Sequence, residues 1–455
     1  MTKKIQSINP FTGELNAEFS LLTREELSEK IDLAYKTFLE WRKTPNSKKK
    51  ELMLKFADII EENQAELAEI ETKEMGMLYN YSFAGLSKTA NLIRWFANNF
   101  EEILAKKEFE SNGLNVIEQY DPIGVIYGVA PWNFPFNQVL RAAVPNVLAG
   151  NTTVYKHASN TPIAGAKIEE LFLKAGFPAG VYQNIFVSGS ESEYILSRKE
   201  VQGVNLTGSE GAGSAVGALA GKYLKRSVLE LGGNDAFIVA TTSDIKKIAE
   251  EAIKARISNN GQKCNSSKRF LVPEKYYDEF CKYAVEFTKN LVIGDPMDEK
   301  TQIGPMARAD LVDEIHSQVE KTIGEGAKLL IGGEKLDRKG YFYAPTILAD
   351  VTPEMTSYKE EIFGPVASII KVKDLDEAVK LANNSDFGLC GCVYGDDFEE
   401  LKEIASQIET GMVFVNKPAA SQASLPFGGV KKSGYGKENG PDGLKAFTNK
   451  KVIVL

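Results

Sequence analysis

The chain has 455 residues, enough for two or three domains, with 43% hydrophobic and 25% charged residues, which are ordinary values for a globular protein. The formal net charge of -8 excludes a general nucleic-acid binder, because such a protein needs a basic surface to meet phosphates. No apolar run is long enough to span a bilayer, and the N-terminus lacks the apolar stretch of a signal peptide. We therefore expect a cytoplasmic protein without membrane or nucleic-acid partners.

Helices are expected over the first hundred residues. Thr23 and Glu26 have capping-box spacing ahead of an amphipathic run that ends near Arg42. A second helix is predicted over roughly residues 48–75, ending at Gly76, and a third over LSKTANLIRWFANNFEEIL. The periodicity then becomes that of strands in VIEQY and GVIYGVAP, on either side of a turn.

Between residues 150 and 245, short apolar strands alternate with helices, one of which is predicted from Pro162 to Ala175. This order predicts βαβ units and a parallel sheet covered on both faces. A second α/β stretch follows to about residue 415, with the strand RFLVP and the helices KYYDEFCKYAVEFTKNL and LVDEIHSQVEKTIGEG. The fold class is therefore α/β, and we place a boundary near residue 230 from the position of the motifs.

The chain has four cysteines with no paired CxxC motif to hold zinc, and only two histidines, His157 and His316. This scarcity limits the available chemistry, because Ser-His-Asp triads and His-ligated metals each depend on an imidazole. Cys281 lies in a predicted helix and Cys390 and Cys392 in an apolar strand, where cysteine is usually a core residue. Cys264 lies instead in the polar, glycine-preceded loop NGQKCNSSKR and is the candidate nucleophile. The neighbouring Lys263 would favour its thiolate, although a chance surface lysine is the alternative explanation.

Three further positions carry candidate chemistry, each with an ordinary structural alternative. Glu230 ends an apolar strand before two glycines, where a carboxylate is either hydrogen-bonded, ion-paired or used in catalysis. Asn133 lies among apolar and proline residues and either pins a loop or donates to an oxyanion. The GxGxxG fingerprint is missing, but Gly208 and Ser209 leave a strand and open a helix, which suits a phosphate or simply a tight turn.

In combination, these segments resemble the aldehyde dehydrogenase family over essentially the whole chain. The segments that carry the resemblance are PWNFP (131–135), VYKHAS (154–159), LTGS (206–209), LELGGND (229–235), NGQKC (260–264), EEIFGPV (360–366) and PFGGVKKSGYG (426–436). Each is only suggestive alone, but seven in the right order are highly specific. The resemblance implies an enzyme that oxidises an aldehyde to an acid with reduction of NAD or NADP.

The resemblance also implies the roles of individual residues. Cys264 would be the nucleophile that forms a thiohemiacetal and then a thioester, Glu230 the general base, and Asn133 an oxyanion donor together with the Cys264 backbone N–H. The cofactor residues implied are Lys156 and Glu361 for ribose hydroxyls, Ser209 for the pyrophosphate, and Trp132 and Phe363 near the nicotinamide ribose. No metal site is expected, because the sequence has no paired CxxC motif and only two histidines.

The short N-terminus, KHAS, GPMAR and PFGGVKKSGYG look most like the shorter bacterial succinate-semialdehyde dehydrogenases. Arg141 stands where such enzymes carry an arginine that grips the distal carboxylate; the alternative is a helix arginine in a surface ion pair. Ser258 occupies the place of a second arginine found in longer relatives, and Arg256 is out of register. Other aldehyde specificities, such as an aliphatic aldehyde, an aminoaldehyde or glyceraldehyde phosphate, and a non-catalytic member of the family stay open as alternatives.

Cofactor preference is read at Ser159, three places beyond Lys156. NAD-selective relatives often have a glutamate there, which repels a 2′-phosphate, whereas serine removes that repulsion and can donate to the phosphate. We therefore expect NADP to be preferred and NAD to be usable.

The resemblance further implies an aldehyde dehydrogenase-like fold with three parts. These are a variant Rossmann cofactor domain (1–105 and 121–230), an α/β catalytic domain (231–430), and an oligomerisation hairpin with a C-terminal tail (106–120 and 431–455). The hairpin implies a homodimer or homotetramer, because an uncovered hairpin edge is an aggregation hazard.

Overall fold

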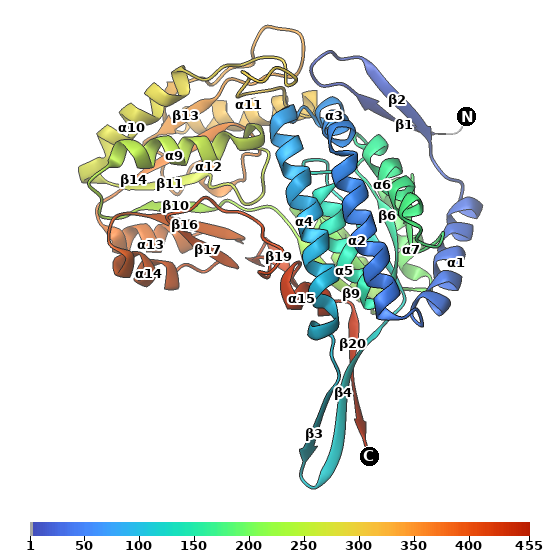
Figure 1. Cartoon of the computed structure of the whole chain (residues 1–455). Helices are drawn as coiled ribbons and strands as arrows, with labels where there is room; N and C mark the ends of the chain where they lie inside the picture. Colours follow the sequence, from blue (N-terminus) through green and yellow to red (C-terminus); the bar gives the residue numbers. More distant parts are fainter. Residues whose placement is uncertain (1–2) are drawn as a thin grey trace.

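The computed structural model describes residues 3–455, and two large sheets occupy the two halves of its body (Figure 1). The first sheet has six strands, and all its pairs are parallel except the one between its edge strand β19 and β9. In spatial order the strands are β19 (Gly434–Tyr435), β9 (Arg226–Glu230), β8 (Val201–Thr207), β5 (Val125–Val129), β6 (Thr152–Lys156) and β7 (Tyr182–Asn184).

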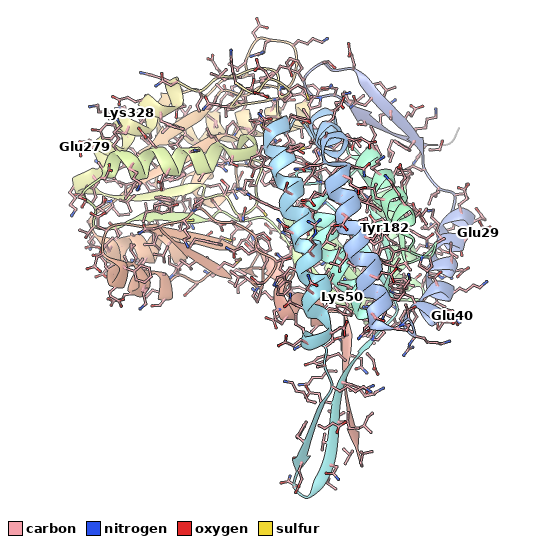
Figure 2. All side chains as sticks on the ribbon, in the orientation of Figure 1. Glu29, Glu40, Lys50, Tyr182, Glu279 and Lys328 are labelled. Atoms are coloured by element: carbon pink, nitrogen blue, oxygen red, sulfur yellow. The ribbon has the colours of Figure 1, made fainter. Side chains whose placement is uncertain are left out.

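Helices cover both faces of this first sheet. Adjacent residues of β6 point to opposite faces, and accordingly Val154 packs in one apolar core while Tyr155 packs in another. Tyr182, labelled in Figure 2, is buried in the second of these cores, whereas the labelled Glu29 lies on the surface. The helices of this half are α1 (Arg24–Trp41), α2 (Asn46–Glu62), α3 (Gln64–Met75), α4 (Tyr79–Ile103), α5 (Asn137–Ala149), α6 (Pro162–Ala175), α7 (Ser192–Ser197) and α8 (Glu210–Lys222), with the short 3-10 helix η1 (Gly189–Glu191).

The second sheet has seven strands and is also parallel, except for its antiparallel edge strand β12. In spatial order these are β12 (Lys328–Ile331), β13 (Thr346–Ala349), β14 (Val366–Val372), β11 (Arg269–Pro273), β10 (Ala236–Val239), β16 (Cys390–Tyr394) and β17 (Met412–Val415). Phe237 and Ile238 pack in different cores, so this sheet too is covered on both faces. Its helices are α9 (Ile245–Ile257), α10 (Glu274–Lys289), α11 (Ala309–Gly324), α12 (Thr356–Lys359), α13 (Leu375–Asn383) and α14 (Phe398–Ser406).

A three-stranded antiparallel sheet projects from the body at the lower end of Figure 1. It consists of the hairpin β3 (Lys107–Ser111) and β4 (Leu114–Pro122) with the C-terminal strand β20 (Thr448–Val454). The remaining elements are short: β1 (Lys4–Ile8) pairs with β2 (Leu15–Ser20), β15 (Phe387–Gly388) pairs with β18 (Val430–Lys431), and α15 (Gly440–Lys445) packs on α5.

The expected α/β class is confirmed, and so is the capping box, in which Thr23 and Glu26 bond each other's backbone at the start of α1. The single helix predicted over 48–75 is wrong, because Asn63 divides it into α2 and α3. The Asn63 side-chain amide donates to the Ile59 carbonyl at 2.6 Å and so competes with the helical backbone bonds. The second helix does end at Gly76, which has a left-handed φ of 76°.

Within residues 3–455, no helix is both long enough and apolar enough to cross a membrane. The four cysteines are all free thiols, and Cys390 and Cys392 are buried in β16 as the apolar strand pattern predicts.

Candidate active site

Cys264 lies on a tight loop between the two halves of the chain, after α9 and the 3-10 helix η2 (Ser258–Gly261). Asn259 and Asn260 have left-handed φ angles of 51° and 54°, which asparagine tolerates better than most residues. Gly261 is also left-handed, and a Cβ there would lie 2.1 Å from the Gly364 carbonyl oxygen. The sequence Asn-Asn-Gly therefore makes the turn that carries Cys264 into the interior.

The side-chain amide of Asn133 is held in one orientation beside this loop. Its Nδ2 donates to the Gln262 carbonyl at 2.9 Å, and its Oδ1 accepts from Gln138 Nε2 at 3.0 Å. The Asn259 amide donates to the Asn133 carbonyl at 3.1 Å. Because Nδ2 carries two hydrogens and Gln262 takes one, a second N–H stays available next to the cysteine loop. Asn133 therefore pins the loop and retains a free donor.

Glu230 is the last residue of β9 and is almost completely buried. Neither carboxylate oxygen has a hydrogen-bond partner among the described residues, so the ion-pair alternative is wrong. Burial raises the pKa of Glu230 well above its usual value, Glu438 raises it further, and Arg141 and Lys437 oppose the rise. A buried, unsatisfied carboxyl is costly, and such groups concentrate at functional sites.

Arg141 is buried in the middle of α5 and forms an ion pair through Nε with Glu438, with 4% and 2% of the two side chains exposed. The surface ion pair considered from the sequence is therefore wrong, since this pair lies in the interior. Asn205 Nδ2 donates to the other oxygen of Glu438 at 3.0 Å, and the guanidinium lies 4.4 Å from the centre of the Phe427 ring. Arg141 Nη2 has no partner among the described residues and can take an anionic ligand.

The charges of this cluster influence one another. Burial lowers the pKa of Arg141, but Glu438, Glu230 and Cys264 raise it, so that it lies above its usual value and the guanidinium is charged. Burial raises the pKa of the Cys264 thiol to about 11, opposed by Arg141 and by Lys268, while Glu361 adds to the rise. The cysteine, the carboxylate and the arginine predicted from the sequence are therefore brought together.

The residues expected to hold a cofactor lie at the carboxyl ends of the first sheet and on the loop after α12. Lys156 ends β6, is largely buried, and has no carboxylate partner within residues 3–455; burial lowers its pKa. Ser159 is exposed on the loop that follows. Ser209 caps α8 by accepting from Ala212 N at 3.3 Å. An unpaired cation and a helix N-terminus at one sheet edge fit a phosphate-bearing ligand.

The other three expected cofactor residues are Trp132, Phe363 and Glu361, and each contacts a neighbouring part of the chain. The Trp132 and Phe363 rings meet edge to face with centroids 5.7 Å apart. Glu361 accepts from the Gly233 backbone N–H at 3.2 Å and pairs with the buried Lys268 at 2.9 Å. A Cβ on Gly232 would lie 2.1 Å from Glu361 Oε2, so the glycine is required for this close approach.

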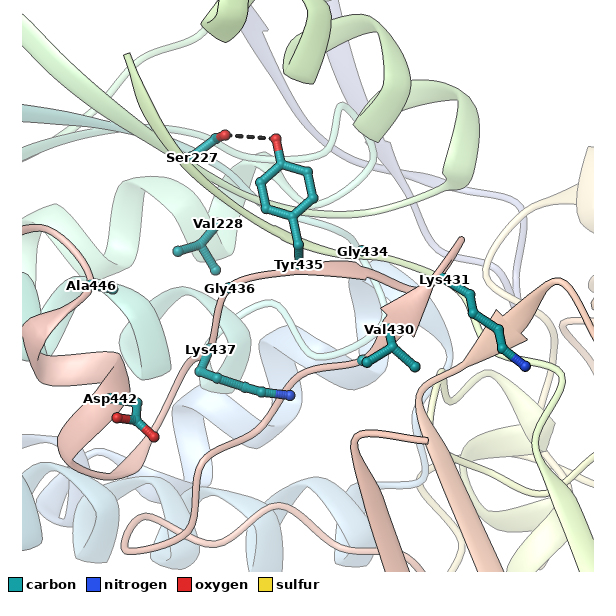
Figure 3. A pocket seen from close by; sticks show the side chains of 11 residues that line it. Ser227, Val228, Val430, Lys431, Gly434, Tyr435, Gly436, Lys437, Asp442 and Ala446 are labelled. Atoms are coloured by element: carbon teal, nitrogen blue, oxygen red, sulfur yellow. Dashed lines mark hydrogen bonds between the residues drawn. The ribbon is translucent and has the colours of Figure 1, made fainter. Parts of the chain in front are cut away.

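The end of the segment PFGGVKKSGYG forms β19, which pairs with β9 so that Gly434 lies opposite Glu230 (Figure 3). Figure 3 shows Tyr435 reaching Ser227, with 2.8 Å between the two hydroxyl oxygens, and Lys437 extending into an open groove. A Cβ on Gly428 would lie 2.4 Å from Glu230 Oε1. The glycines of this motif therefore let the chain pass close to the buried carboxylate.

Sequence reasoning missed Glu438, Gln138 and Lys268, although Glu438 follows the last recognised motif by only two residues. Its charge in an otherwise glycine-rich stretch was the available signal. Arg256, noted as out of register, does not face the site; it is buried and bonds four backbone carbonyl groups, those of Gly261, Ile362, Gly364 and Val366.

This arrangement of a half-buried cysteine, an amide donor and a desolvated carboxylate beside a parallel sheet suited to a dinucleotide is that of an aldehyde-oxidising enzyme. The model of the aldehyde dehydrogenase family matches residues 1–453, and the chain belongs to this family, whose members oxidise aldehydes. The resemblance stated from the motifs is thereby confirmed.

Several of the relatives to which the chain is most similar are named succinate-semialdehyde dehydrogenases. The chain is 40% identical to an Escherichia coli succinate semialdehyde dehydrogenase [NAD(P)+], over 98% of this chain and 97% of that one. It is 39% identical to a Deinococcus radiodurans succinate-semialdehyde dehydrogenase [NADP(+)], over 98% and 94%. The solved structure of succinic semialdehyde dehydrogenase from Streptococcus pyogenes in complex with NADP+ superposes with a TM-score of 0.97 at 37% identity, covering 99% of both chains.

The raised thiol pKa gives a direct test of the cofactor-free site. Because a thiol is thiolate only in proportion to pH while the pH lies below its pKa, alkylation of Cys264 by iodoacetamide should rise about tenfold per pH unit between about pH 7 and pH 9. Mass spectrometry of the Cys264 peptide gives the rates. A plateau within this range would show instead that the thiol is already ionised.

Proposed function

We propose that this protein oxidises succinic semialdehyde to succinate with reduction of NADP, and less efficiently NAD. The observation that carries the proposal is the buried Arg141, charged and with a free Nη2, in the same cluster as Cys264. A desolvated guanidinium binds a carboxylate strongly, and an uncharged aldehyde has nothing to offer it. The names of the relatives support this substrate and this cofactor.

Cys264 acts as the nucleophile. Its thiolate attacks the aldehyde carbon, and the carbonyl oxygen becomes an oxyanion that accepts from the free Asn133 N–H and from the Cys264 backbone N–H. The Asn133 donor is oriented before the reaction, since Gln138 and Gln262 hold its side-chain amide. Donors fixed in a site without water are worth far more than the same donors in solvent.

Glu230 acts as the general base that hydrolyses the thioester. It takes a proton from water, and the hydroxide adds to the acyl carbon while the Cys264 sulfur leaves. A carboxyl whose pKa burial has raised is a better base near neutral pH than an ordinary glutamate. Because Glu438 and Arg141 act on Glu230 in opposite directions, the ion pair also tunes its basicity.

The cofactor fits the residues at the sheet edge. Lys156 and Ser159 would bind the adenosine ribose and its 2′-phosphate, Ser209 at the start of α8 the pyrophosphate, and Glu361 the second ribose, with Trp132 and Phe363 beside it. When bound, the nicotinamide supplies the acceptor for the hydride that leaves the carbonyl carbon. Within residues 3–455, Lys156 has no carboxylate partner, and Ser159 does not repel a phosphate, so the pair favours NADP.

The projecting sheet supports a homo-oligomer, a homodimer or homotetramer. Phe109, Leu114, Val452 and Val454 are exposed on it, although they are large and apolar. Its β3 edge and the β17 edge of the second sheet are both open within the described residues. Open edges of this kind are covered in stable proteins, and a second copy of the chain supplies the cover.

The free cysteines fit the reducing cytoplasm.

The two chemical steps are separable by substitution. Cys264→Ser should abolish turnover but retain cofactor binding, because an alcohol without a strong base is a poor nucleophile. Glu230→Gln should give a burst of reduced cofactor followed by slow turnover, because hydride transfer precedes hydrolysis. Stopped-flow absorbance measures both, with Cys281→Ser as the matched control. Near-normal activity of Cys264→Ser would refute the mechanism.

Arg141→Ala tests the substrate. Loss of a charge-assisted contact to the carboxylate should raise KM for succinic semialdehyde by about 10- to 150-fold, corresponding to roughly 1.5 to 3 kcal/mol, and change KM for butanal far less. Initial rates with both aldehydes give the ratio, which cancels any general damage from leaving Glu438 unpaired. Equal losses for the two aldehydes would mean that Arg141 is structural.

Ser159→Glu tests cofactor recognition. The new carboxylate should repel the 2′-phosphate and accept hydrogen bonds from the free ribose hydroxyls of NAD, so that the kcat/KM ratio moves towards NAD. Steady-state rates with each cofactor measure this, and Ser159→Gln separates charge from size. The interpretation fails if wild-type enzyme reduces NAD well and ignores NADP.

A further inference from the structure

Lys268 is a fully buried cation four residues beyond Cys264, with 2% of its side chain exposed. It lies just before β11, and both its backbone N–H and its backbone carbonyl are hydrogen-bonded. Its N–H donates to the Asp235 carbonyl at 2.9 Å, and its carbonyl accepts from Ser368 N–H at 3.0 Å. The side chain therefore starts from a rigid position between two strands of the second sheet.

All three N–H bonds of the Lys268 ammonium are used within the site. Nζ donates to the Cys264 carbonyl at 2.6 Å and to the Lys263 carbonyl at 3.1 Å, and it pairs with Glu361 Oε1 at 2.9 Å. Burial of an ammonium is expensive unless it is paired and hydrogen-bonded, as this one is. One cation thus joins the Cys264 loop to Glu361, a residue expected to bind the cofactor.

The bond to the Lys263 carbonyl fixes the direction of the proposed backbone oxyanion donor. That carbonyl and the Cys264 N–H belong to the same trans peptide unit, in which the C=O and N–H bonds point in opposite directions. Because Lys268 holds the oxygen, the N–H must point away from it. Donation to the carbonyl also polarises the amide and strengthens its N–H as a donor.

The charges of Lys268 and Glu361 act on the thiol in opposite directions. Lys268 lowers the pKa of Cys264, and Glu361 raises it. Lys263, the cation adjacent in sequence and suggested by the motif, is only half-buried and makes no ion pair among the described residues. The lysine that lowers the pKa of the Cys264 thiol is therefore Lys268, which the motif did not single out, and not Lys263.

We propose that Lys268 is a positioning residue that aims the Cys264 backbone N–H, favours the Cys264 thiolate and holds the Glu361 carboxylate beside the cysteine loop. The assignment rests on the proposed role of Cys264 as the nucleophile. Because Glu361 shares this cation with the cysteine loop, the Lys268 link makes the reactivity of the thiol depend on the charge at position 361.

The test is the alkylation rate of Cys264 by iodoacetamide in cofactor-free enzyme at about pH 8.5, followed by mass spectrometry of the Cys264 peptide. Lys268→Met should slow alkylation about tenfold, the effect of one pKa unit on the thiolate fraction. The matched control Lys263→Met should alkylate at the wild-type rate. Mere loosening of the loop would expose the thiol and accelerate the reaction, so a slower rate separates positioning from structural damage.

Glu361→Gln is a second variant for the same measurement. It leaves Lys268 intact and can be used if Lys268→Met does not fold. Removing the carboxylate should accelerate alkylation severalfold, because the anion no longer opposes the thiolate. A wild-type rate in Lys268→Met, or in Glu361→Gln, would overturn the proposal. The alkylation rate is measured without turnover. Failure of the Lys268 proposal is therefore distinguishable from failure of the proposed function, which would appear as activity retained by Cys264→Ser.

Discussion

The candidate active site depends on one physical constraint, the removal of its charged and ionisable side chains from water. Cys264, Glu230, Arg141 and Glu438 all meet there, and burial is the largest influence on the pKa of the first three. In water these charges would be screened and the carboxylate would be an ordinary acid. In the interior, burial raises the pKa of both the Cys264 thiol and the Glu230 carboxyl, beside a charged arginine that pairs with Glu438 and keeps Nη2 free among the described residues.

The rest of the architecture supplies the rigidity that this desolvation requires. Helix α5 is buried along nearly its whole length and carries Arg141 and Gln138, while Asn133 lies just ahead of it. Two long-range contacts, from Asn133 to Gln262 and from Arg141 to Glu438, tie the first sheet and its helices to the cysteine loop and the C-terminal segment. The site therefore lies where the first sheet, the cysteine loop and the C-terminal segment meet. The polar contacts that join them are buried, and burial strengthens such contacts.

Local signals in the sequence predicted local structure well. The capping box of Thr23, the helix end at Gly76 and the order of strands and helices all follow from nearest-neighbour chemistry, whereas the break at Asn63 depends on one side-chain bond that periodicity does not register. Cys264 and Glu230, the proposed nucleophile and base, lie in segments that were recognisable as motifs. Glu438 was not, because its partner Arg141 lies 297 residues away and only the fold brings the two together.

The central claim is that a dry guanidinium selects an aldehyde with a distal carboxylate. The most direct measurement is the initial rate of the wild-type enzyme with succinic semialdehyde and with butanal, each with NADP and with NAD. We expect kcat/KM for succinic semialdehyde to exceed that for butanal by at least about tenfold, the effect of one charge-assisted contact, and to be higher with NADP than with NAD. Equal or faster oxidation of butanal would contradict it.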